Sequence, residues 1–540
     1  MANFIEEVVE SDLASQKYKK VAFRYPPEPN GYLHIGHAKA ILINYGLAQK
    51  YNGTCNLRFD DTNPIKENDE FVNAIIEDMK WLGWQGEVFY ASDYFERTLE
   101  IAKELIKKGL AFVDTSSSEQ IKQMRGTLTT AGTNSPFRDR SVQDNLSMFE
   151  DMIAGKYNDG QAVLRAKIDM SNPNVNLRDP IIYRVLNVPH YRQGDKYKVY
   201  PMYDFAHPIQ DAIEGITHSC CSLEFENNRP LYDWVVKHSA DWKVVPHQYE
   251  FARLNIDGIK LSKRHLIGLV QQNIVDGWDD PRMPTIVGLR RRGYTPQSIK
   301  KFCQDIGVSK SNSTVDVAML ESCIRDELNS TAQRAMVAID PIQLSIVNRD
   351  ENWTETLTFD TVVDGKTLDS SAVSISNTLY IDRADFDLNP PPKYKRLTVG
   401  GFVRLKSAYI VKCTGFEKDS CGNVLKVFCE IVENSKSGQD KSGIKGAGVI
   451  HWVDSLSAID VTCRHFYELF LQGDELNPDS KVEVGAKMDA NFLEKADSFQ
   501  FLRNGYYCKD RSYSKYGLVN PNVEIVFNKI VGLKDSFNNK

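Results

Sequence analysis

Long apolar runs, paired cysteines and a basic leader are all missing from this sequence. No window approaches the roughly 20 uninterrupted apolar residues that a membrane-spanning helix needs. The opening residues, MANFIEEVVESDL, are acidic and do not contain the basic and apolar regions of a signal peptide. The 10 cysteines form no Cys-x-x-Cys pair, so neither a zinc ribbon nor a disulfide framework is indicated. We therefore expect a cytoplasmic protein in a reduced setting, with no membrane partner and no metal held by the protein itself.

Excess positive charge is missing as well. The formal net charge of −6 argues against indiscriminate binding to nucleic acid. A local basic path is compatible with it, because residues 290–292 (RRR) and 300–301 (KK) can contact phosphates, although a solvated helix face explains such runs too. With 540 residues, 42% hydrophobic and 26% charged, the composition is that of a soluble globular protein of about three to five domains.

The most informative stretch is residues 20–62, KVAFRYPPEPNGYLHIGHAKAILINYGLAQKYNGTCNLRFDDT. Residues 21–25 alternate in the manner of a strand, and the prolines and Asn30-Gly31 that follow end it in a turn. Apolar residues at helical spacing predict a helix from His34, and a second strand runs from Asn56 to Phe59. Strand, turn, helix and strand form the half-unit of a nucleotide-binding α/β fold.

The turn has features that suit a phosphate. Gly31 and Gly36 lack a Cβ atom, so a nucleotide can approach the backbone, and the start of a helix favours an anion. His34 and His37 are three residues apart and can donate hydrogen bonds to phosphate oxygens. The alternatives are a two-histidine metal pair or ordinary histidines at a helix end. A zinc site would need further ligands, and no matching Cys or His pair lies nearby in the sequence.

Two motifs in the chain resemble a known family. The run from Arg24 to Lys39 closely resembles the glutaminyl-tRNA synthetases, whose class I signature is matched by His34-Ile35-Gly36-His37, and the resemblance continues over nearly the full chain. The glutamyl enzymes are similar there but typically differ at Pro29-Asn30. The run Lys260-Leu261-Ser262-Lys263-Arg264 resembles the second signature, Lys-Met-Ser-Lys-Ser. It departs from that signature at its second and last positions and keeps the Ser262-Lys263 pair.

The resemblance implies an α/β fold with a Rossmann-like catalytic core and C-terminal β-barrels. The sequence pattern agrees, because the alternation of strand and helix is lost between 110 and 200, residues 266–339 are helical in pattern, and strands follow Asp340-Pro341. The Ser-, Gly- and Lys-rich stretch 435–448 is expected to be an exposed loop. We predict a catalytic domain over 1–92 and 203–253, an acceptor-stem-binding insertion over 93–202, a helical subdomain with the KLSKR loop over 254–338, and two anticodon-binding β-barrels over 339–540.

The implied reaction is ATP-dependent formation of glutaminyl-adenylate, followed by transfer of glutamine to the terminal ribose of tRNA(Gln). His34, His37 and Lys263 are the predicted catalytic residues, because charge develops on phosphate oxygens during the first step. No general base is needed, since a carboxylate is already ionised at pH 7. Mg²⁺ is expected to accompany the triphosphate. The other residues that match ATP-binding positions of the family are Glu28, Pro29, Asn30, Ile35, Gly36, Ala38, Lys39, Ala40, Ser222, Arg253, Leu254, Leu261 and Ser262.

Four residues match amino-acid-binding positions of the family. Asp60 is expected to pair with the α-ammonium, Tyr203 to hydrogen-bond the side-chain amide, and Arg24 to hold an oxygen in the same pocket. Each of these three residues also has a structural explanation: a turn cap for Asp60, a core position for Tyr203 and a surface ion pair for Arg24. Cys221 falls where the family has a small neutral residue and where glutamyl relatives often carry arginine. A neutral residue there favours glutamine over glutamate.

Three residues match positions that contact tRNA in the family. Leu128, within RGTLT at 125–129, is expected to act as an apolar wedge that opens the first base pair of the acceptor stem, although a packing leucine is the plain alternative. Asn227 stands where related enzymes often have Asp against acceptor-stem bases. Arg334 matches a position near the first anticodon base. By composition alone, KYKR at 393–396 and RNGYY at 503–507 are further candidates for the anticodon loop.

Three other functions compete with a monomeric glutamine–tRNA ligase. A glutamyl enzyme of the same fold is disfavoured by Pro29-Asn30 and Cys221. A nucleotidyltransferase that binds no tRNA is disfavoured by the insertion and by the strand-rich C-terminal stretch. A non-catalytic tRNA-binding or regulatory protein is disfavoured by the intact residues of both signatures.

Overall fold

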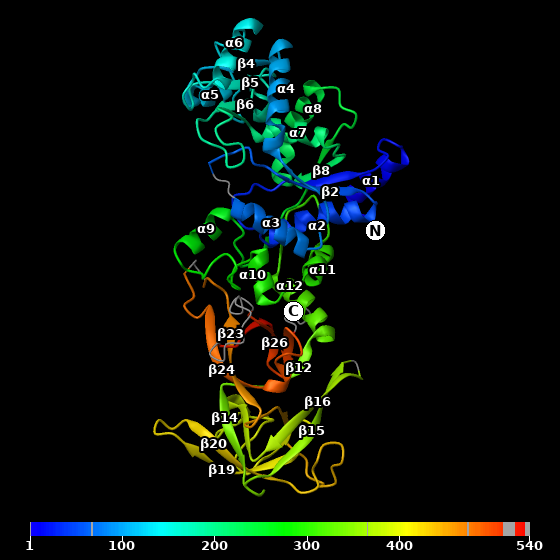
Figure 1. Cartoon of the computed structure of the whole chain (residues 1–540), viewed down its shortest axis with the longest axis vertical. Helices are drawn as coiled ribbons and strands as arrows, with labels where there is room; N and C mark the ends of the chain where they lie inside the picture. Colours follow the sequence, from blue (N-terminus) through cyan, green and yellow to red (C-terminus); the bar gives the residue numbers. More distant parts are fainter. Residues whose placement is uncertain (1, 66–68, 364, 472–474, 511–523, 535–540) are drawn as a thin grey trace. The chain divides into compact units, whose positions relative to one another are not determined.

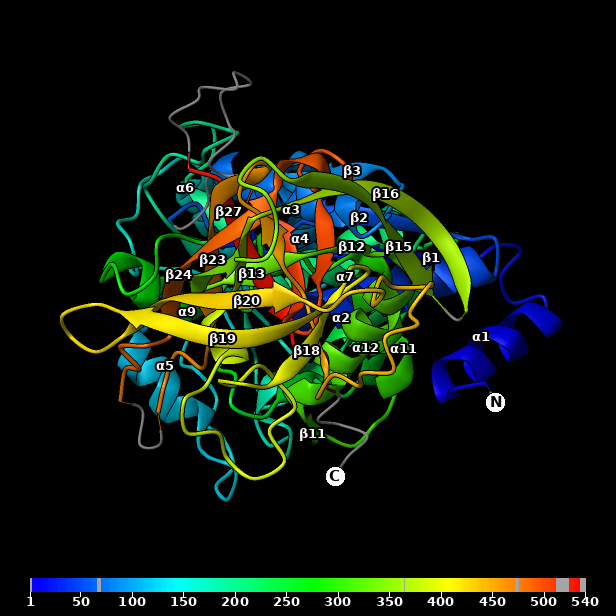
Figure 2. The same ribbon diagram turned by 90° about the horizontal axis from the view of Figure 1, so that it is seen from below.

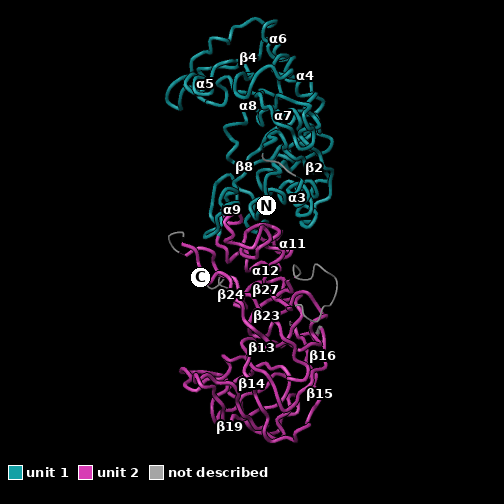
Figure 3. Tube along the Cα trace, turned by 60° about the vertical axis from the view of Figure 1, so that its left-hand side comes forward, with its two compact units in different colours: residues 1–268, 303–315 teal, residues 269–302, 316–540 magenta. Residues whose placement is uncertain are grey.

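The computed structural model describes residues 2–65, 69–363, 365–471, 475–510 and 524–534. The chain divides into two compact units (Figure 3). Unit 1 comprises Met1–Gly268 and Cys303–Val315, and unit 2 comprises Leu269–Phe302 and Asp316–Lys540. Among the described residues, no helix combines the length and the apolar character that a membrane crossing requires. The domain borders expected from the sequence stay predictions.

Unit 1 begins with the α/β half-unit that the sequence predicts (Figure 1). Strand β1 pairs in parallel with β2, and β2 pairs in parallel with β3. Helix α2 starts directly after His34, so the strand, turn, helix and strand at 20–62 are confirmed. The elements of this part are α1 (Phe4–Ala14), β1 (Ala22–Tyr25), α2 (Ile35–Lys50), β2 (Thr54–Phe59), α3 (Asp69–Trp81) and β3 (Val88–Tyr90).

The parallel sheet resumes after an antiparallel segment. The backbone N–H of Thr217 donates to the carbonyl of Ala22 at 3.0 Å, which brings β8 (His218–Ser222) beside β1. Strand β8 in turn pairs in parallel with β9 (His247–Phe251). The carboxyl ends of β1, β2 and β8 therefore meet at one edge, which is where open parallel sheets bind ligands.

The antiparallel segment between β3 and β8 has its own core. Its four strands pair in the order β4, β5, β6, β7, and α4, α6, α7 and α8 contribute buried apolar residues to the same cluster, such as Leu105, Phe149 and Phe205. The elements are η1 (Ala91–Tyr94), α4 (Phe95–Lys107), β4 (Ala111–Asp114), α5 (Ser118–Arg125), α6 (Val142–Ile153), β5 (Val163–Ala166), η2 (Val175–Leu177), β6 (Ile181–Val185), β7 (Val199–Pro201), α7 (Tyr203–Ile213), η3 (Leu223–Asn228) and α8 (Arg229–Ser239).

The signature loop and the helical stretch follow. Strand β10 (Leu254–Ile256) pairs in parallel with β11 (Ser313–Val315). Of the predicted KLSKR loop, Lys260, Leu261 and Ser262 lie in the connection between β10 and α9 (Lys263–Gln271). Lys263 and Arg264 are the first two residues of α9, so the loop prediction is wrong for these two. The helices are α9 (Lys263–Gln271), α10 (Ile286–Arg292), α11 (Pro296–Ile306) and α12 (Val317–Thr331), so the predicted helical pattern is confirmed in its main elements.

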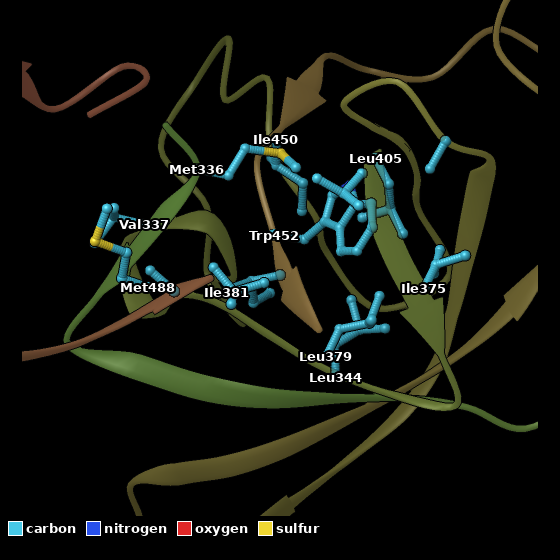
Figure 4. Close-up of a cluster of buried hydrophobic side chains, with 14 of the residues drawn as sticks. Met336, Val337, Leu344, Ile375, Leu379, Ile381, Leu405, Ile450, Trp452 and Met488 are labelled. Atoms are coloured by element: carbon cyan, nitrogen blue, oxygen red, sulfur yellow. The ribbon is translucent and has the colours of Figure 1, made fainter. Parts of the chain in front are cut away.

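Two seven-stranded sheets make up most of unit 2, which confirms the change to strands after Asp340. One has the order β12-β25-β26-β27-β23-β24-β13, and the other the order β21-β18-β19-β20-β14-β17-β22. Figure 2 shows β19 and β20 side by side, and the two strands pair as an antiparallel hairpin. Residues 435–448 form a loop without helix or strand, as expected. Buried side chains from both sheets, among them Trp452, Leu344 and Met488, belong to one apolar cluster (Figure 4).

The strands of unit 2 have the following bounds: β12 (Gln333–Ala335), β13 (Val337–Ile339), β14 (Pro341–Ile346), β15 (Thr354–Val363), β16 (Lys366–Ser376), β17 (Thr378–Asp382), β18 (Phe402–Leu405), β19 (Ile410–Lys418), β20 (Val424–Ile431), β21 (Val449–Ile450), β22 (Val453–Asp454), β23 (Ala458–Phe466), β24 (Lys481–Asp489), β25 (Ser498–Phe501), β26 (Gly505–Lys509) and β27 (Val526–Val531). Short 3-10 helices lie at η4 (Arg383–Asp385) and η5 (Ala490–Phe492).

Candidate functional site

A cavity of about 550 Å³ lies in unit 1 where the carboxyl ends of β1, β2 and β8 meet the start of α2. Its size suits a nucleotide or a comparable small molecule. Most of the predicted ATP and amino-acid residues line it: Glu28, His34, Gly36, His37, Lys39, Ala40, Asp60, Tyr203, Cys221, Ser222, Arg253, Leu254, Leu261, Ser262 and Lys263. The predicted residues that do not line it are Arg24, Pro29, Asn30, Ile35 and Ala38.

The two histidines of the first signature are held at the start of α2. The backbone N–H of Gly36 donates to Nδ1 of His34 at 3.1 Å, and that of His34 donates to Nδ1 of His37 at 3.0 Å. The rings stack with centroids 3.7 Å apart. Because Nδ1 accepts in both rings, the proton of each neutral imidazole lies on Nε2. Burial lowers the pKa of His34 to about 4 and lowers that of His37 well below its usual range. Both histidines are therefore neutral donors at pH 7.

The lysine of the second signature reaches the turn after β1. Nζ of Lys263 donates to Oδ1 of Asn30, and the amide of Asn30 donates to the carboxylate of Glu28. Burial lowers the pKa of Lys263, and the charge of Glu28 opposes that shift. A Cβ atom on Gly31 would lie 3.0 Å from Cε of Lys263, so the glycine leaves room for the lysine chain. Asn30 thus lies outside the cavity lining and contacts it through Lys263.

Asp60 is a buried carboxylate at the end of β2. Thr62 donates to its Oδ1 at 2.9 Å, and only 7% of the residue is exposed. Burial, aided by the negative charges of Glu28 and Asp61, raises the pKa of Asp60 to about 7. A positively charged group of a ligand would therefore bind favourably next to Asp60, because it stabilises the ionised form of this carboxyl group.

Tyr203 and Cys221 form the neutral wall of the cavity. The Tyr203 ring stacks on His207, one turn further along α7, with centroids 4.9 Å apart. Burial raises the pKa of both the Tyr203 hydroxyl and the Cys221 thiol, so both groups stay protonated at pH 7. The wall therefore offers hydrogen bonds without a charge.

Arg24 lies behind this wall. Its guanidinium is fully buried and donates to Asp211 at 3.1 Å, to Ser219 at 2.7 Å and to the carbonyl of Cys220 at 2.8 Å. Arg58 donates to the same oxygen of Asp211 at 2.6 Å. The structure thus gives Arg24 partners other than a ligand, and its predicted contact with the amino acid stays a prediction.

Sequence reasoning missed two residues that support the site. Asp211 accepts from both buried arginines and from the Tyr232 hydroxyl at 2.8 Å, and these positive charges hold its pKa far below its usual range. Gln248 donates to the carbonyl of Phe225, a cavity residue, at 3.0 Å. The two arginine partners of Asp211 lie 153 and 187 residues away, Tyr232 lies 21 residues away, and the partner of Gln248 lies 23 residues away, so no local motif marks Asp211 or Gln248.

The RGTLT loop presents Leu128 to solvent. Leu128 is 84% exposed, which excludes the packing role that was the plain alternative. Nη1 of the buried Arg178 donates to the carbonyls of Arg125, Thr127 and Thr130 at 2.8 to 2.9 Å. Arg178, a further residue that the sequence reading missed, therefore fixes the turn that carries Leu128.

The other predicted tRNA residues have varied surroundings. The Asn227 side chain is exposed, while its carbonyl accepts from Asn174 at 2.8 Å and Asn176 at 3.1 Å. In unit 2, Arg334 is 7% exposed and donates to the carbonyls of Ala332 and Asn329.

The two clusters placed by composition are tied to one acid. Arg396 and Arg503 both pair with the buried carboxylate of Asp385, and Tyr507 is fully buried. In the basic run 290–292, Arg291 pairs with Asp510 at 3.0 Å. Arg291, Arg396 and Arg503 thus pair with carboxylates of the protein, whereas Lys393 and Lys395 of KYKR are exposed. The anticodon role of both clusters stays a prediction.

Among the residues that the structure describes, no group of three metal-ligating side chains lies at the cavity. Asp382, Asp385 and His451 in unit 2 are grouped closely enough to hold an ion. Arg396 and Arg503 already pair with Asp385, and Nε2 of His451 lies 3.1 Å from Asp382, so these ligand atoms already have partners within the protein.

Comparisons with known proteins cover nearly the whole chain. The family described as tRNA synthetases class I (E and Q), catalytic domain, matches residues 20–330. Its anti-codon binding domains match residues 332–432 and 449–510. The glutamine–tRNA ligase of Actinobacillus succinogenes is 48% identical over 99% of this chain and 97% of its own, and that of Clostridium perfringens is 49% identical over 99% and 98%. A crystal structure of glutamate-tRNA synthetase from Elizabethkingia anophelis has a TM-score of 0.44, 20% identity, and covers 58% of this chain and 71% of its own.

Proposed function

This chain belongs to the class I tRNA synthetases for glutamate and glutamine, and from that premise we propose that the cavity at the end of β1 activates glutamine with ATP. The chain is an aminoacyl-tRNA ligase that joins glutamine to tRNA. The observation that carries the placement is the convergence of both signatures on one cavity, with Lys263 reaching Asn30 beside His34 and His37.

In the first step, a carboxylate oxygen of glutamine attacks the α-phosphorus of ATP and pyrophosphate leaves. Negative charge grows on the phosphate oxygens, and fixed donors stabilise it. The Nε2–H groups of His34 and His37 are such donors, because their Nδ1 atoms are already occupied. Lys263 supplies the positive charge. The adenosine part has room along Lys39, Ala40, Arg253 and Leu254.

ATP is proposed to carry Mg²⁺ with it. The cavity offers Glu28, Asp60 and Glu224 as carboxylates, and among the described residues these are not grouped closely enough to hold one ion together. Mg²⁺ keeps several waters and binds through phosphates in such sites. The ion would neutralise charge on the leaving pyrophosphate.

Glutamine is proposed to lie between Asp60, Tyr203 and Cys221. Its α-ammonium would restore the ionised form of Asp60, and its side-chain amide would meet the neutral wall. A glutamate side chain would bring a negative charge to a wall without a free cation, since Asp211 neutralises Arg24. This asymmetry supports glutamine over glutamate.

In the second step, a hydroxyl of the terminal ribose of tRNA attacks the adenylate carbonyl and AMP leaves. The exposed Leu128 is proposed to open the acceptor stem, with Asn227 beside its bases and Arg334 near the anticodon. The proposal includes a monomeric, cytoplasmic enzyme. All 10 cysteines are free thiols, which supports a reducing compartment.

The deciding experiment is aminoacylation with labelled glutamine and labelled glutamate on matched tRNAs. We expect product with glutamine and tRNA(Gln) only. The Lys263→Ala variant should lower kcat about 10²-fold, whereas Arg264→Ala, an exposed neighbour outside the cavity, should not. Preferential charging with glutamate would overturn the amino-acid assignment, and an unchanged rate for Lys263→Ala would overturn the site.

A further inference from the structure

Unit 2 contains a second, much smaller cavity of about 120 Å³. It is formed by the last residue of α10, by α12 and by the ends of β23 and β27, of which Figure 3 labels α12, β23 and β27. Its charged or basic wall residues are Arg292, Glu321, His465 and Lys529. The volume is too small for a nucleotide but is enough for one tetrahedral anion.

Lys529 has no anionic partner. Among the described residues its ammonium forms no hydrogen bond or ion pair, and it lies 5.9 Å from the ring centroid of Tyr507. Burial lowers the pKa of Lys529, and the positive charge of Arg292 lowers it further. A half-buried cation that is repelled by a second cation is a site that an anion would stabilise.

Arg292 is also incompletely satisfied. Its guanidinium lies over the Phe466 ring, 5.7 Å from the centroid. Its Nε–H is buried and has no acceptor in the part of the chain that the structure describes. Glu321 is the acid in the cavity wall, and it pairs with Arg325 at 3.8 Å, one turn along α12. Buried donors are nearly always satisfied, so an orphaned one on a cavity wall indicates a missing ligand.

His465 adds a neutral polar group to the same wall. Burial and the charge of Lys529 lower the pKa of His465 to about 4, so it is uncharged at pH 7. Its Nε2 lies 3.1 Å from the Tyr507 hydroxyl. The cavity wall therefore contains the two cations Arg292 and Lys529, one neutral hydrogen-bonding ring, and Glu321, which pairs with Arg325.

We propose that this cavity binds a single phosphate group between the Arg292 guanidinium and the Lys529 ammonium. A guanidinium offers a planar fork of donors and an ammonium a compact charge, and both match phosphate oxygens. The group can be free inorganic phosphate or one backbone phosphate of tRNA. Only the second source rests on the proposed function.

The first test titrates inorganic phosphate into the full chain by calorimetry at constant ionic strength. We expect saturable binding of phosphate by the wild type. In Lys529→Met and in Arg292→Gln the affinity should fall about tenfold, because each variant loses one charge-assisted contact. Lys529→Arg should retain binding. Lys534→Met, an exposed lysine outside the cavity, should match the wild type, and Glu321→Gln should bind more tightly because a like charge is removed. Unfolding midpoints show that each variant is folded.

The second test measures tRNA binding against salt concentration. If a backbone phosphate occupies the cavity, Lys529→Met should reduce the slope of log Kd against log salt by about 0.7 to 0.9, and free phosphate should compete. If Lys529→Met binds inorganic phosphate more weakly than the wild type but keeps the wild-type salt dependence of tRNA binding, the cavity is assigned to free phosphate. Equal phosphate binding by wild type and Lys529→Met, or no saturable binding at millimolar phosphate, overturns the proposal. A chain that binds phosphate here but no tRNA refutes the proposed function alone.

Discussion

His34 and His37 form a reciprocal pair at the start of α2, in which the backbone N–H of His34 donates to Nδ1 of His37 and the two rings stack 3.7 Å apart. A Cβ atom on Gly36 would lie 2.9 Å from the His34 ring, so this residue must be small for the pair to form. The spacing of the signature is thus a packing requirement as well as a chemical one.

Replacement of His34 by Asn separates its two roles. Asn can accept the Gly36 N–H as a helix cap but lacks the Nε2–H donor. We expect His34→Asn to keep its unfolding midpoint and to lose about 10²-fold in the rate of adenylate formation, measured by single-turnover assay with tRNA present. His34→Ala should lose stability too. An unaltered rate in His34→Asn would contradict the donor role.

Asp60 should make glutamine binding depend on pH. Its pKa of about 7 means that acid converts the carboxylate into a neutral acid that cannot pair with an ammonium. We expect kcat/KM for glutamine, which reports the free enzyme, to fall as pH drops below about 7, approaching tenfold per pH unit. Asp60→Asn should be slow and should lack this inflection. The KM for ATP serves as the control, and an inflection that survives in Asp60→Asn would assign it elsewhere.

Cys221 should set the preference for glutamine. Cys221→Arg places a cation in the neutral wall, so the ratio of kcat/KM for glutamine over glutamate should decrease. Cys221→Ser keeps the wall neutral and should preserve the ratio. Competition between the two labelled amino acids measures it. A constant ratio in a folded Cys221→Arg protein would move the discrimination to Tyr203 or to other cavity residues.

Arg178 and Leu128 should act together on the acceptor stem. Leu128→Ala should lower kcat/KM for a tRNA with an intact first base pair, because the wedge no longer offsets unstacking. Arg178→Gln should do the same by freeing three carbonyls of the loop. A tRNA whose first pair is mismatched should restore both variants. Failure of the mismatch to rescue Leu128→Ala would exclude the wedge.

Arg503 should matter for stability more than for anticodon reading. Its carboxylate partner Asp385 is 1% exposed and still pairs with Arg396 after the change. Arg503→Gln should therefore lower the free energy of unfolding by about 1.5–3 kcal/mol, the contribution of a hydrogen bond to a charged group. An anticodon base change costs the wild type about 1–3 kcal/mol in kcat/KM if one base contact is lost, and this cost should persist in the variant. Chemical denaturation and aminoacylation of the substituted tRNA measure the two effects. Loss of base discrimination at unchanged stability would contradict this assignment.

The sequence by itself determined the features that lie within short segments. The helix beginning after His34 and the strand that ends before Pro26 depend on neighbours in the chain, since periodicity, proline and glycine act locally. The strands expected after Asp340-Pro341 are present as well. The predicted preference for glutamine came from the resemblance at Pro29-Asn30 and Cys221, which are short-range features too.

Only the tertiary structure decided which of these charges are available. Arg24 begins the run 24–39 that resembles the family, yet its partner Asp211 is 187 residues away. Arg503 finds Asp385 at a separation of 118 residues, and the pKa of Asp60 depends on burial by the whole cavity wall. Lys529 resembles any other lysine in the sequence, and its lack of a partner becomes visible only when its neighbours are in place. Desolvation and Coulomb energy sum over atoms that folding brings together, so no sequence window contains them.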